Sequence, residues 1–310
     1  MREKKFNPTF LVIGILFILM SCENDDPKPI ELSSISVKTP PIKVEYYMSE
    51  VLDLSGLVIT LAFDNGQTEN IIYSDFENRD ISTSPENGSI LSESTDIKVI
   101  HNPTGKITSF FITLSSVLVD IEGNTYSIVK IGNQLWMGEN LKTTKNNDGT
   151  SIPLEENDIA WNTLSTSAFC WFDNNKAMYS DTYGALYNWH AVNTNKLCPK
   201  GWHIPTDEEW IALVDFLGGE EVAGGKLKES GTSHWNSPNE GANNSSGFTA
   251  LPGGCRSDLF HSLGDGGRWW SSTQFDDANA WVLSVNYIYA STFWYNYTKS
   301  HGYSVRCIRD

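Results

Sequence analysis

The stretch from Cys198 to Trp210, with the sequence CPKGWHIPTDEEW, decides how the second half of the chain folds. Within it, Thr206 and Glu209 have the spacing of a capping box, in which a hydroxyl and a carboxylate satisfy two free amides at the start of a helix. An apolar face then continues to Leu217, and two glycines end the pattern. The stretch predicts a helix from Thr206 to about Leu217 that packs on a core through its tryptophan.

The composition divides the chain into two unlike parts. All 11 tryptophans lie between Trp136 and Trp294, in a chain of 310 residues that is 40% hydrophobic and 19% charged. This asymmetry predicts two globular domains after removal of an export segment. The formal net charge of −16 argues against a nucleic-acid partner, because sequence-independent binding needs basic patches on the phosphates.

Residues 1–21 have the features of a signal peptide. Basic residues precede the apolar run 10–20, which is shorter than the roughly 20 residues of a membrane-spanning helix. The run ends in Leu-Met-Ser-Cys, and these four residues resemble the lipobox of bacterial lipoproteins, in which the cysteine is diacylated and becomes the new N-terminus. The resemblance implies a membrane anchor at Cys22; the alternative is an ordinary secretory cleavage beside an incidental cysteine.

Residues 22–33 form an acidic tether that opens with Glu-Asn-Asp-Asp after the cysteine. Acidic residues at this place resemble the signal that sends some lipoproteins of Gram-negative bacteria to the outer face of the outer membrane. Any polar tether carries similar charges, which is the alternative. The expected localisation is therefore an outer-membrane lipoprotein that faces the cell exterior.

Residues 34–115 carry short alternating β segments with regular turns and no helical period. The segments 57–63 and 68–73 flank the turn Asp-Asn-Gly, and 97–100 and 107–114 flank a second turn. This spacing predicts an all-β sandwich. The run from Ile35 to Leu57 also resembles bacterial Ig-like modules of surface proteins, which implies a spacer; the alternative is a domain that binds a ligand itself.

Six segments of the second part occur in the same order as in a known family. They are GNQLWMGENL (132–141), YGALYNW (183–189), CPKGWHIPT (198–206), GFTALPGG (247–254), WSST (270–273) and SVRCIRD (304–310). They are similar to the FISUMP, or major paralogous, domain of bacterial surface proteins. The resemblance covers residues 118–310. It implies an α+β domain of the fold group of C-type-lectin-like domains and formylglycine-generating enzymes.

Local patterns predict the elements of this second domain. The segments 119–121 and 125–131 should pair as a hairpin, and Asp181 can cap a helix over 183–192. Further strands are expected at 280–285, 293–297 and 303–308. The segments 236–247 and 258–268 are rich in Gly, Asn and Ser, so we expect long loops, which carry binding functions more often than strands.

Four cysteines remain after the lipobox, at positions 170, 198, 255 and 307. An even number in an exported chain predicts disulfides, with three possible pairings. The resemblance to lectin-like domains favours Cys198 with Cys307, which leaves Cys170 with Cys255 as a second, weaker pair. Family members usually have an aromatic residue where Cys255 stands. The spacings do not suit a zinc site, whose ligands come in close pairs.

The motifs indicate a non-catalytic protein. The six histidines are scattered, and no HExxH, GxSxG or phosphate-binding glycine loop occurs. Glu208 and Glu209 do not suit glycoside hydrolysis, because adjacent helical residues point in different directions. The catalytic cysteine motif of the formylglycine-generating enzymes cannot be matched. No cofactor is expected, but a structural calcium stays open, because oxygen ligands occur in the loops at Asn239, Glu240, Asp258, Asp265, Asp276 and Asp277.

Clustered aromatic residues in the last third of the chain are the remaining signal. Exposed aromatic faces beside polar groups often form carbohydrate or peptide surfaces, whereas a domain with few aliphatic residues also fills its core with tryptophan. The predicted ligand-binding residues, chosen in or beside glycine-rich loops, are Trp235, Arg256, Asp258, Trp269 and Trp270. The expected function is binding of an extracellular glycan or surface protein; the alternatives are a structural surface protein or an enzyme.

Overall fold

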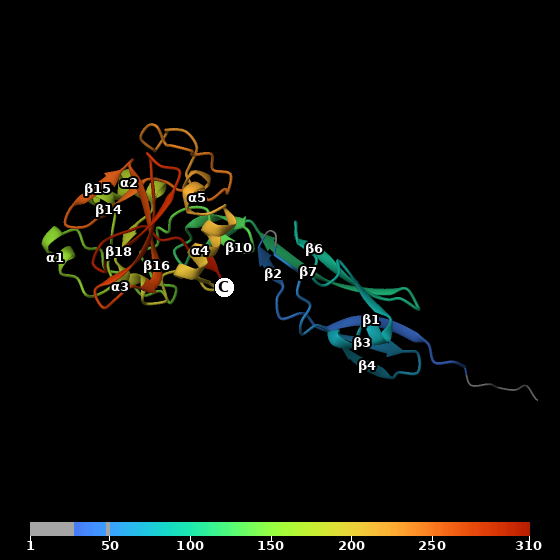
Figure 1. Cartoon of the computed structure of the whole chain (residues 1–310). Coiled ribbons are helices and arrows are strands. Elements are labelled where there is room, and N and C mark those ends of the chain that lie inside the picture. Colours follow the sequence, from blue (N-terminus) through green and yellow to red (C-terminus); the bar gives the residue numbers. More distant parts are fainter. Residues whose placement is uncertain (1–27, 48–49) are drawn as a thin grey trace, which may run out of the picture.

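The computed structural model describes residues 28–47 and 50–310 (Figure 1). The predicted signal peptide, the lipidation site Cys22 and the first part of the tether lie outside these residues. The described chain forms two regions that lie end to end, and the consecutive strands β7 (Lys106–Ser115) and β8 (Val117–Val119) connect them. Strands outnumber helices, which confirms a β-rich fold. Within the described residues, no helix is long and apolar enough to cross a membrane.

The N-terminal region contains two sheets. Strands β1 (Leu32–Thr39), β3 (Val58–Phe63) and β4 (Thr68–Ile72) form the first, in the order β1-β3-β4. The second has the order β2-β7-β6-β5, with β2 (Glu45–Tyr47), β6 (Thr95–His101) and β5 (Ile81–Ser84). Two short 3-10 helices, η1 (Tyr73–Asp75) and η2 (Glu77–Arg79), lie between β4 and β5 along the chain.

The two sheets share an aliphatic core. Ile59 and Ile71 of the first sheet belong to the same buried cluster as Ile81 and Val99 of the second. Both predicted hairpins are confirmed, because β3 pairs with β4 and β6 pairs with β7, each antiparallel. Alternating apolar residues on these strands therefore face one layer of side chains between the sheets.

The C-terminal region is organised by a five-stranded sheet in the order β13-β19-β10-β9-β8. Its strands come from distant parts of the chain: β9 (Thr125–Ile131), β10 (Gln134–Met137), β13 (Trp202–His203) and β19 (Ile308–Arg309). The predicted hairpin forms, but its first strand is β8 at Val117–Val119 and not at 119–121, because residues 120–124 make the turn to β9. Because β19 lies between β13 and β10, the last residues of the chain close the domain.

Helix α4 (Asp207–Phe216) begins with the predicted capping box. The Thr206 hydroxyl accepts the Glu209 amide at 3.3 Å, and the Glu209 carboxylate accepts the Thr206 amide at 2.9 Å. The helix buries Trp210, whose ring lies 4.6 Å from that of Trp136 on β10. An aromatic cluster that also includes Phe248 therefore attaches the helix to the sheet.

A second sheet of this region is antiparallel and three-stranded, in the order β16-β17-β18. Its strands are β16 (Gly266–Gln274), β17 (Asn279–Asn286) and the edge strand β18 (Thr292–Thr298). The predicted strands at 280–285 and 293–297 are confirmed. Helix α5 (Glu220–Leu227) packs against β18. Further elements of this region are α1 (Asp158–Asn162), β11 (Phe169–Cys170) and η3 (Phe172–Asn174).

Three predicted elements are wrong. The helix expected over 183–192 is interrupted at Gly184, where φ is +73° and a Cβ would lie 2.7 Å from the Leu141 carbonyl oxygen. In its place the chain forms α2 (Lys176–Tyr183), β12 (Leu186–Tyr187) and α3 (Trp189–Val192). The loop expected at 258–268 contains β15 (Phe260–Leu263), which pairs with β14 (Gly253–Arg256) and thereby satisfies its backbone groups. The strand expected at 303–308 is regular only at β19.

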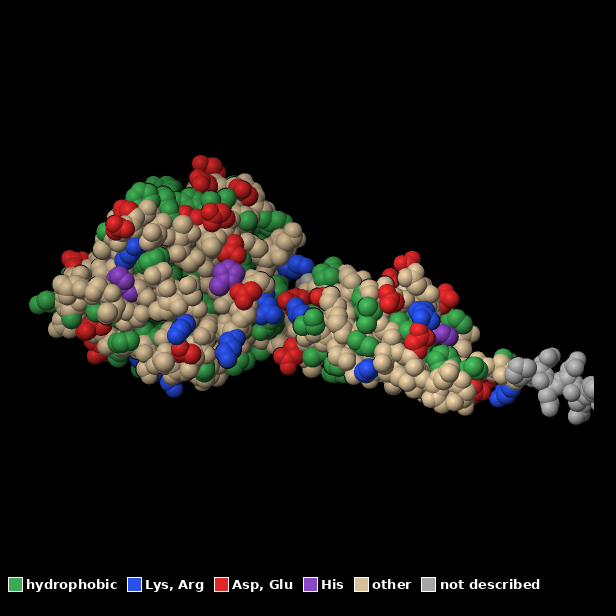
Figure 2. All heavy atoms as spheres, turned by 90° about the horizontal axis from the view of Figure 1, so that it is seen from below, with side chains coloured by type: hydrophobic (Ala, Val, Ile, Leu, Met, Phe, Trp, Pro, Cys, Tyr) green, Lys and Arg blue, Asp and Glu red, His purple; other side chains and the backbone are tan. Residues whose placement is uncertain are grey.

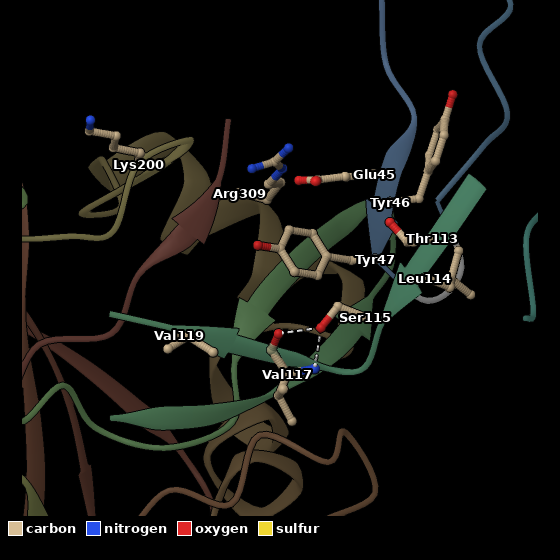
Figure 3. A pocket seen from close by; sticks show the side chains of 10 residues that line it. All are labelled: Glu45, Tyr46, Tyr47, Thr113, Leu114, Ser115, Val117, Val119, Lys200 and Arg309. Atoms are coloured by element: carbon tan, nitrogen blue, oxygen red, sulfur yellow. Dashed lines mark hydrogen bonds between the residues drawn. The ribbon is translucent and has the colours of Figure 1, made fainter. Parts of the chain in front are cut away.

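The two regions meet around Arg309 (Figure 3). Its guanidinium lies 5.1 Å from the centre of the Tyr47 ring and 3.6 Å from the Glu50 carboxylate, both in the N-terminal region. It also donates to the Gly201 carbonyl at 3.0 Å. A cavity of about 420 Å³ opens beside this contact, and the Glu45 carboxylate points toward the guanidinium. Acidic and basic side chains meet at this junction on the face seen in Figure 2.

Candidate functional site

The three tryptophans predicted to bind a ligand are core residues, so this prediction is wrong. Trp269 and Trp270 are consecutive on β16 and point to opposite faces of its sheet, yet both are buried. The indole N–H of Trp269 donates to the Asn140 side chain at 2.8 Å. That of Trp270 donates to the Tyr187 carbonyl at 2.7 Å, and Trp235 is buried in the same way. Their rings fill the core while their polar atoms find partners inside it.

Arg256 is also structural rather than available to a ligand. Its guanidinium is fully buried and donates to the Glu155 carbonyl at 2.7 Å and to the Asp158 carboxylate at 2.7 Å. It lies 4.5 Å from the centre of the Trp161 ring. The arginine therefore anchors the segment around α1. Asp258 is exposed at the tip of the β14–β15 hairpin and does not join the other predicted binding residues.

The cysteines agree with the prediction only in part. Cys198 and Cys307 form a disulfide, with their Cα atoms 5.9 Å apart. Cys170 and Cys255 are free and buried, so the second predicted disulfide is wrong. The physical reason is that the two thiols lie in different clusters: Cys170 packs with Trp161, whereas Cys255 belongs to the main core around Trp270.

The exposed aromatic surface lies instead on the edge strand β18. Phe293, Tyr295 and Tyr297 alternate with other residues along this strand and so share one face of the sheet. Tyr289, in the turn before the strand, extends the series. We call these four residues the aromatic row. Tyr289 is 50% exposed and Tyr295 is 42% exposed, which makes the row unlike the buried tryptophans.

The rings of the aromatic row are evenly spaced. The ring centres of Tyr289 and Phe293 are 5.5 Å apart, and those of Phe293 and Tyr295 are 6.3 Å apart. Tyr295 and Tyr297 follow at 5.6 Å. A row of adjacent rings offers an extended apolar surface with hydroxyl groups at intervals, which suits a ligand that is itself long and amphipathic.

A buried cation supports one end of the aromatic row. The Lys228 ammonium donates to the carbonyl groups of Glu240, Asn286 and Tyr289 at 2.9, 2.9 and 2.8 Å. Burial lowers the pKa of this ammonium to about 8, and the Glu240 carboxylate acts in the opposite direction. Because two of the three carbonyls belong to the end of β17 and to the turn that follows it, Lys228 holds Tyr289 in place.

Polar groups flank the other end of the row. The register places Arg268 of β16 beside Ser284 of β17, and Ser284 beside Phe293 of the row. Burial raises the pKa of Tyr297, while Arg268 acts to lower it through charge and a hydrogen bond. The His301 ring lies 5.9 Å from that of Tyr297. The row therefore ends at a cluster of hydrogen-bonding groups.

Tyr289, Tyr295 and Tyr297 belong to the clustered aromatic residues of the sequence, but the predicted ligand-binding residues include no member of the aromatic row. Aromatic residues at positions 293, 295 and 297 repeat with the period of two that is typical of one face of a strand. Their exposure follows from the position of β18 at the sheet edge, which depends on long-range pairing. The short-range pattern identified the strand but not the side of it that stays uncovered.

Several loop oxygens considered for calcium make local hydrogen bonds. Asp276 accepts from the amides of Ala278 and Asn279 at 2.8 and 2.7 Å. Asp265 accepts from the Asn236 side chain at 2.8 Å. Across residues 28–47 and 50–310, no group of three or more His, Cys, Asp or Glu side chains is placed to hold a metal ion. A structural calcium stays a prediction.

Comparison with known families gives one match. The model of the Fibrobacter succinogenes major domain matches residues 129–309, which span the C-terminal region from β9 to β19. This match confirms the resemblance seen in the six ordered sequence segments. No curated protein matches the chain.

Proposed function

Since the chain belongs to the Fibrobacter succinogenes major domain family, we propose that it is an outer-membrane lipoprotein whose C-terminal region binds an extracellular glycan or surface protein. In this proposal the chain performs no catalysis. The membrane is contacted through a lipid on Cys22, and the tether faces the cell exterior. The two sheets of the N-terminal region act as an Ig-like spacer, and the family region has a lectin-like arrangement.

The aromatic row is the observation that supports binding. Two of its rings are about half exposed, although burying an aromatic side chain is favourable and the chain buries nine tryptophans almost completely. Contiguous exposed aromatic surface marks an interaction site more often than a single exposed residue does. The C–H faces of a sugar chain and the side chains of an extended peptide both suit such a surface.

A glycan is the ligand that the row favours. Its rings lie along one strand at intervals of 5.5 to 6.3 Å, so successive units of a linear saccharide can contact successive rings. Tyrosine hydroxyls and Arg268 add hydrogen-bonding groups beside the apolar surface. An extended peptide is the second candidate, because β18 is a sheet edge and can pair with an added strand.

A glycan-array screen of the whole chain tests this proposal, repeated with and without calcium. We expect Tyr295→Ala and Tyr289→Ala to weaken binding, because each removes an exposed ring. Phe111→Ala is the matched control, since Phe111 is 56% exposed but lies on β7 of the N-terminal region. Retained binding in both row variants contradicts this site. Absence of binding to any glycan or surface protein favours the structural role, and turnover of a bound glycan makes the chain an enzyme.

The lipid anchor has a separate test. Replacing Cys22 by Ala should release the protein from membranes and remove an acyl mass from the N-terminal peptide. Protease shaving of whole cells then reports which side of the membrane the chain faces. Unchanged membrane fractionation without an acyl group at Cys22 contradicts the anchoring proposal and leaves the binding proposal to its own experiment.

A further inference from the structure

A thiol, an imidazole and a guanidinium meet beside the end of the aromatic row. Cys255 on β14 and His261 on β15 are directly opposite in the antiparallel register. The Cys255 sulfur lies 3.4 Å from Nδ1 of His261, and a guanidinium N–H of Arg268 donates to it at 3.2 Å. Three elements, β14, β15 and β16, therefore place a base and a cation on one buried sulfur.

The contacts of His261 indicate which of its two ring nitrogens carries the proton. Nε2 lies 3.0 Å from the Ser257 hydroxyl oxygen, and that hydroxyl lies 2.8 Å from the Asp258 carboxylate. If the hydroxyl donates to the carboxylate, its oxygen accepts Nε2–H, and Nδ1 is left as an acceptor that faces the thiol. The Ser262 hydroxyl also approaches Nδ1, at 3.3 Å. The tautomer that satisfies this relay is the one that can accept the thiol proton.

We propose that Cys255 is a peroxide-reactive thiol, for which His261 is the base and Arg268 stabilises the thiolate. The oxidant is hydrogen peroxide, and the product is a sulfenic acid at Cys255. Cys255 is 1% exposed, so only a reagent close to water in size reaches it without opening of the hairpin. The assignment concerns a modification site and does not depend on ligand binding by the aromatic row.

The reaction balances through the same groups. Nδ1 of His261 takes the thiol proton, and the sulfur attacks one peroxide oxygen as the O–O bond breaks. The departing hydroxide takes the proton back from His261 and leaves as water. The sulfur is oxidised by two electrons, the peroxide is reduced by two, and the imidazole returns to its neutral state. The thiolate formed in the first step lies against the Arg268 guanidinium.

The electrostatics explain why a base is needed. Burial raises the pKa of the Cys255 thiol, although Arg268 acts to lower it. Burial and the charge of Arg268 lower the pKa of His261, while Asp258 acts to raise it, so the imidazole is neutral and able to accept a proton. The other titratable groups near the cluster are Tyr297, His301 and Tyr303.

Cys170 provides an internal control in the same molecule. It is also free and buried, and burial raises the pKa of its thiol to about 12. The charged groups that act on it are Arg256, Asp158 and Glu156, which do not include an imidazole. The two thiols therefore share burial and a neighbouring arginine, and they differ in the presence of a base.

The test oxidises the folded full-length chain with hydrogen peroxide, removes the peroxide with catalase, and then unfolds the chain in excess dimedone, which labels the sulfenic acids already formed. Peptide mapping by mass spectrometry then follows each cysteine separately, Cys22 included. We expect Cys255 to be oxidised at least about tenfold faster than Cys170, in keeping with the size of general-base effects. His261→Asn should remove this advantage, whereas His234→Asn, which changes a histidine paired with Glu229, should preserve it.

The pH profile of the wild-type chain gives a readout that is independent of any variant. A thiol with His261 as its base reacts faster as pH rises through the lowered pKa of the imidazole, below about pH 6.5. A thiol without a base gains rate only above about pH 8.5. Equal oxidation of Cys255 and Cys170, oxidation of Cys255 only when denaturant is present together with the peroxide, or a profile that rises only in the alkaline range would each overturn the proposal.

Discussion

The two regions of the molecule stabilise their cores in different ways. The N-terminal region packs aliphatic side chains of two regular sheets, such as Ile59 and Val99, and contains no tryptophan or cysteine among residues 28–115. The C-terminal region buries nine tryptophans, a disulfide and the charged groups of Arg256, Arg306 and Lys228. Regular sheets satisfy their own backbone groups, so an apolar core is sufficient there.

The C-terminal region has long irregular segments whose carbonyl groups need donors from elsewhere. Arg306 donates to the carbonyls of Met137, Phe248 and Thr249, and to the Asn140 side chain. Burial lowers the pKa of Arg306 to about 9, which still leaves it charged at neutral pH. Buried cations therefore donate the hydrogen bonds that neighbouring strands donate in a regular sheet. This difference from the N-terminal region can be tested by removing one stabilising group at a time.

Loss of the disulfide should have the largest effect. Cys198 and Cys307 are 109 residues apart, and the chain-entropy model gives a bridge over such a loop about 4 to 5 kcal/mol of stabilisation. We expect the Cys198→Ala, Cys307→Ala double variant to lose that amount from the free energy of unfolding of the C-terminal region. Urea titration followed by tryptophan fluorescence measures this region alone, because all 11 tryptophans lie in it.

The N-terminal region supplies the control for this measurement. Hydrogen exchange of peptides from residues 28–115 should stay unchanged in the double variant and in wild type treated with a reductant. If protection falls equally in both regions, they unfold as one unit through the contact at Arg309, and the comparison between two independent cores fails.

Removal of the Arg306 guanidinium should have the next largest effect. Replacing Arg306 by Met preserves length and apolar contact but leaves three backbone carbonyls without their donor. The replacement removes the donors, whereas the backbone carbonyls stay buried without a hydrogen bond. We therefore expect the free energy of unfolding to fall by about 3 to 4 kcal/mol. The same tryptophan-detected urea titration measures it.

Arg79 in the N-terminal region is the matched control, because it forms an exposed ion pair with Glu69. Arg79→Met should leave the stability of its region within about 0.5 kcal/mol of wild type. An equal, small effect of both replacements would show that water reaches the carbonyls around Arg306, and the proposed role of buried cations would then be wrong.

Local signals predicted the elements whose determinants lie close together in the sequence. The capping box of Thr206 and Glu209 predicted α4, and the turn at 64–66 predicted the hairpin of β3 and β4. The six sequence segments, which occur in the order of a known family, predicted the extent of the C-terminal region. The helix expected over 183–192 failed because the backbone of Leu141, distant in sequence, passes close to Gly184.

The candidate site was harder to predict for the same reason. Glycine-rich neighbours suggested that Trp269 and Trp270 lie in a loop, but pairing of β16 with β17 places both indoles in cores. Likewise, Cys255 meets His261 only through the register of β14 with β15. Exposure and side-chain clusters are properties of long-range pairing, whereas caps, turns and strand alternation are properties of a short window.

A smaller effect is expected from the cap of α4. Thr206→Ala removes the hydroxyl that accepts the Glu209 amide and should lower the free energy of unfolding of the C-terminal region by about 1 kcal/mol. Among residues 28–47 and 50–115, the helices are the 3-10 helices η1 and η2, which lack side-chain caps. Thr206→Ser retains the acceptor and should preserve stability; a loss as large as that of the alanine variant would assign the effect to packing of the methyl group.

The smallest effect should come from pH at His203. Its Nδ1 lies 2.7 Å from the Asp310 carboxylate and its Nε2 lies 2.9 Å from that of Glu209. Burial disfavours the charged ring, but the hydrogen bonds and charges of these carboxylates outweigh it and raise the pKa of His203. A folded-state pKa above the unfolded value means that the proton binds the folded state more tightly. The stabilisation is therefore complete below about pH 6.5 and disappears as pH rises through the folded-state pKa.

The difference in the free energy of unfolding between wild type and His203→Gln isolates this contribution from that of the other histidines. Because the His203 side chain is 38% exposed, we expect the difference to shrink by about 0.5 kcal/mol or less between pH 5.5 and pH 8. A difference that grows with pH would reverse the sign of the linkage. It would mean that the two carboxylates bind the neutral His203 ring more tightly than the charged ring. The contact between α4 and the last residues of the chain would then not be an ion pair.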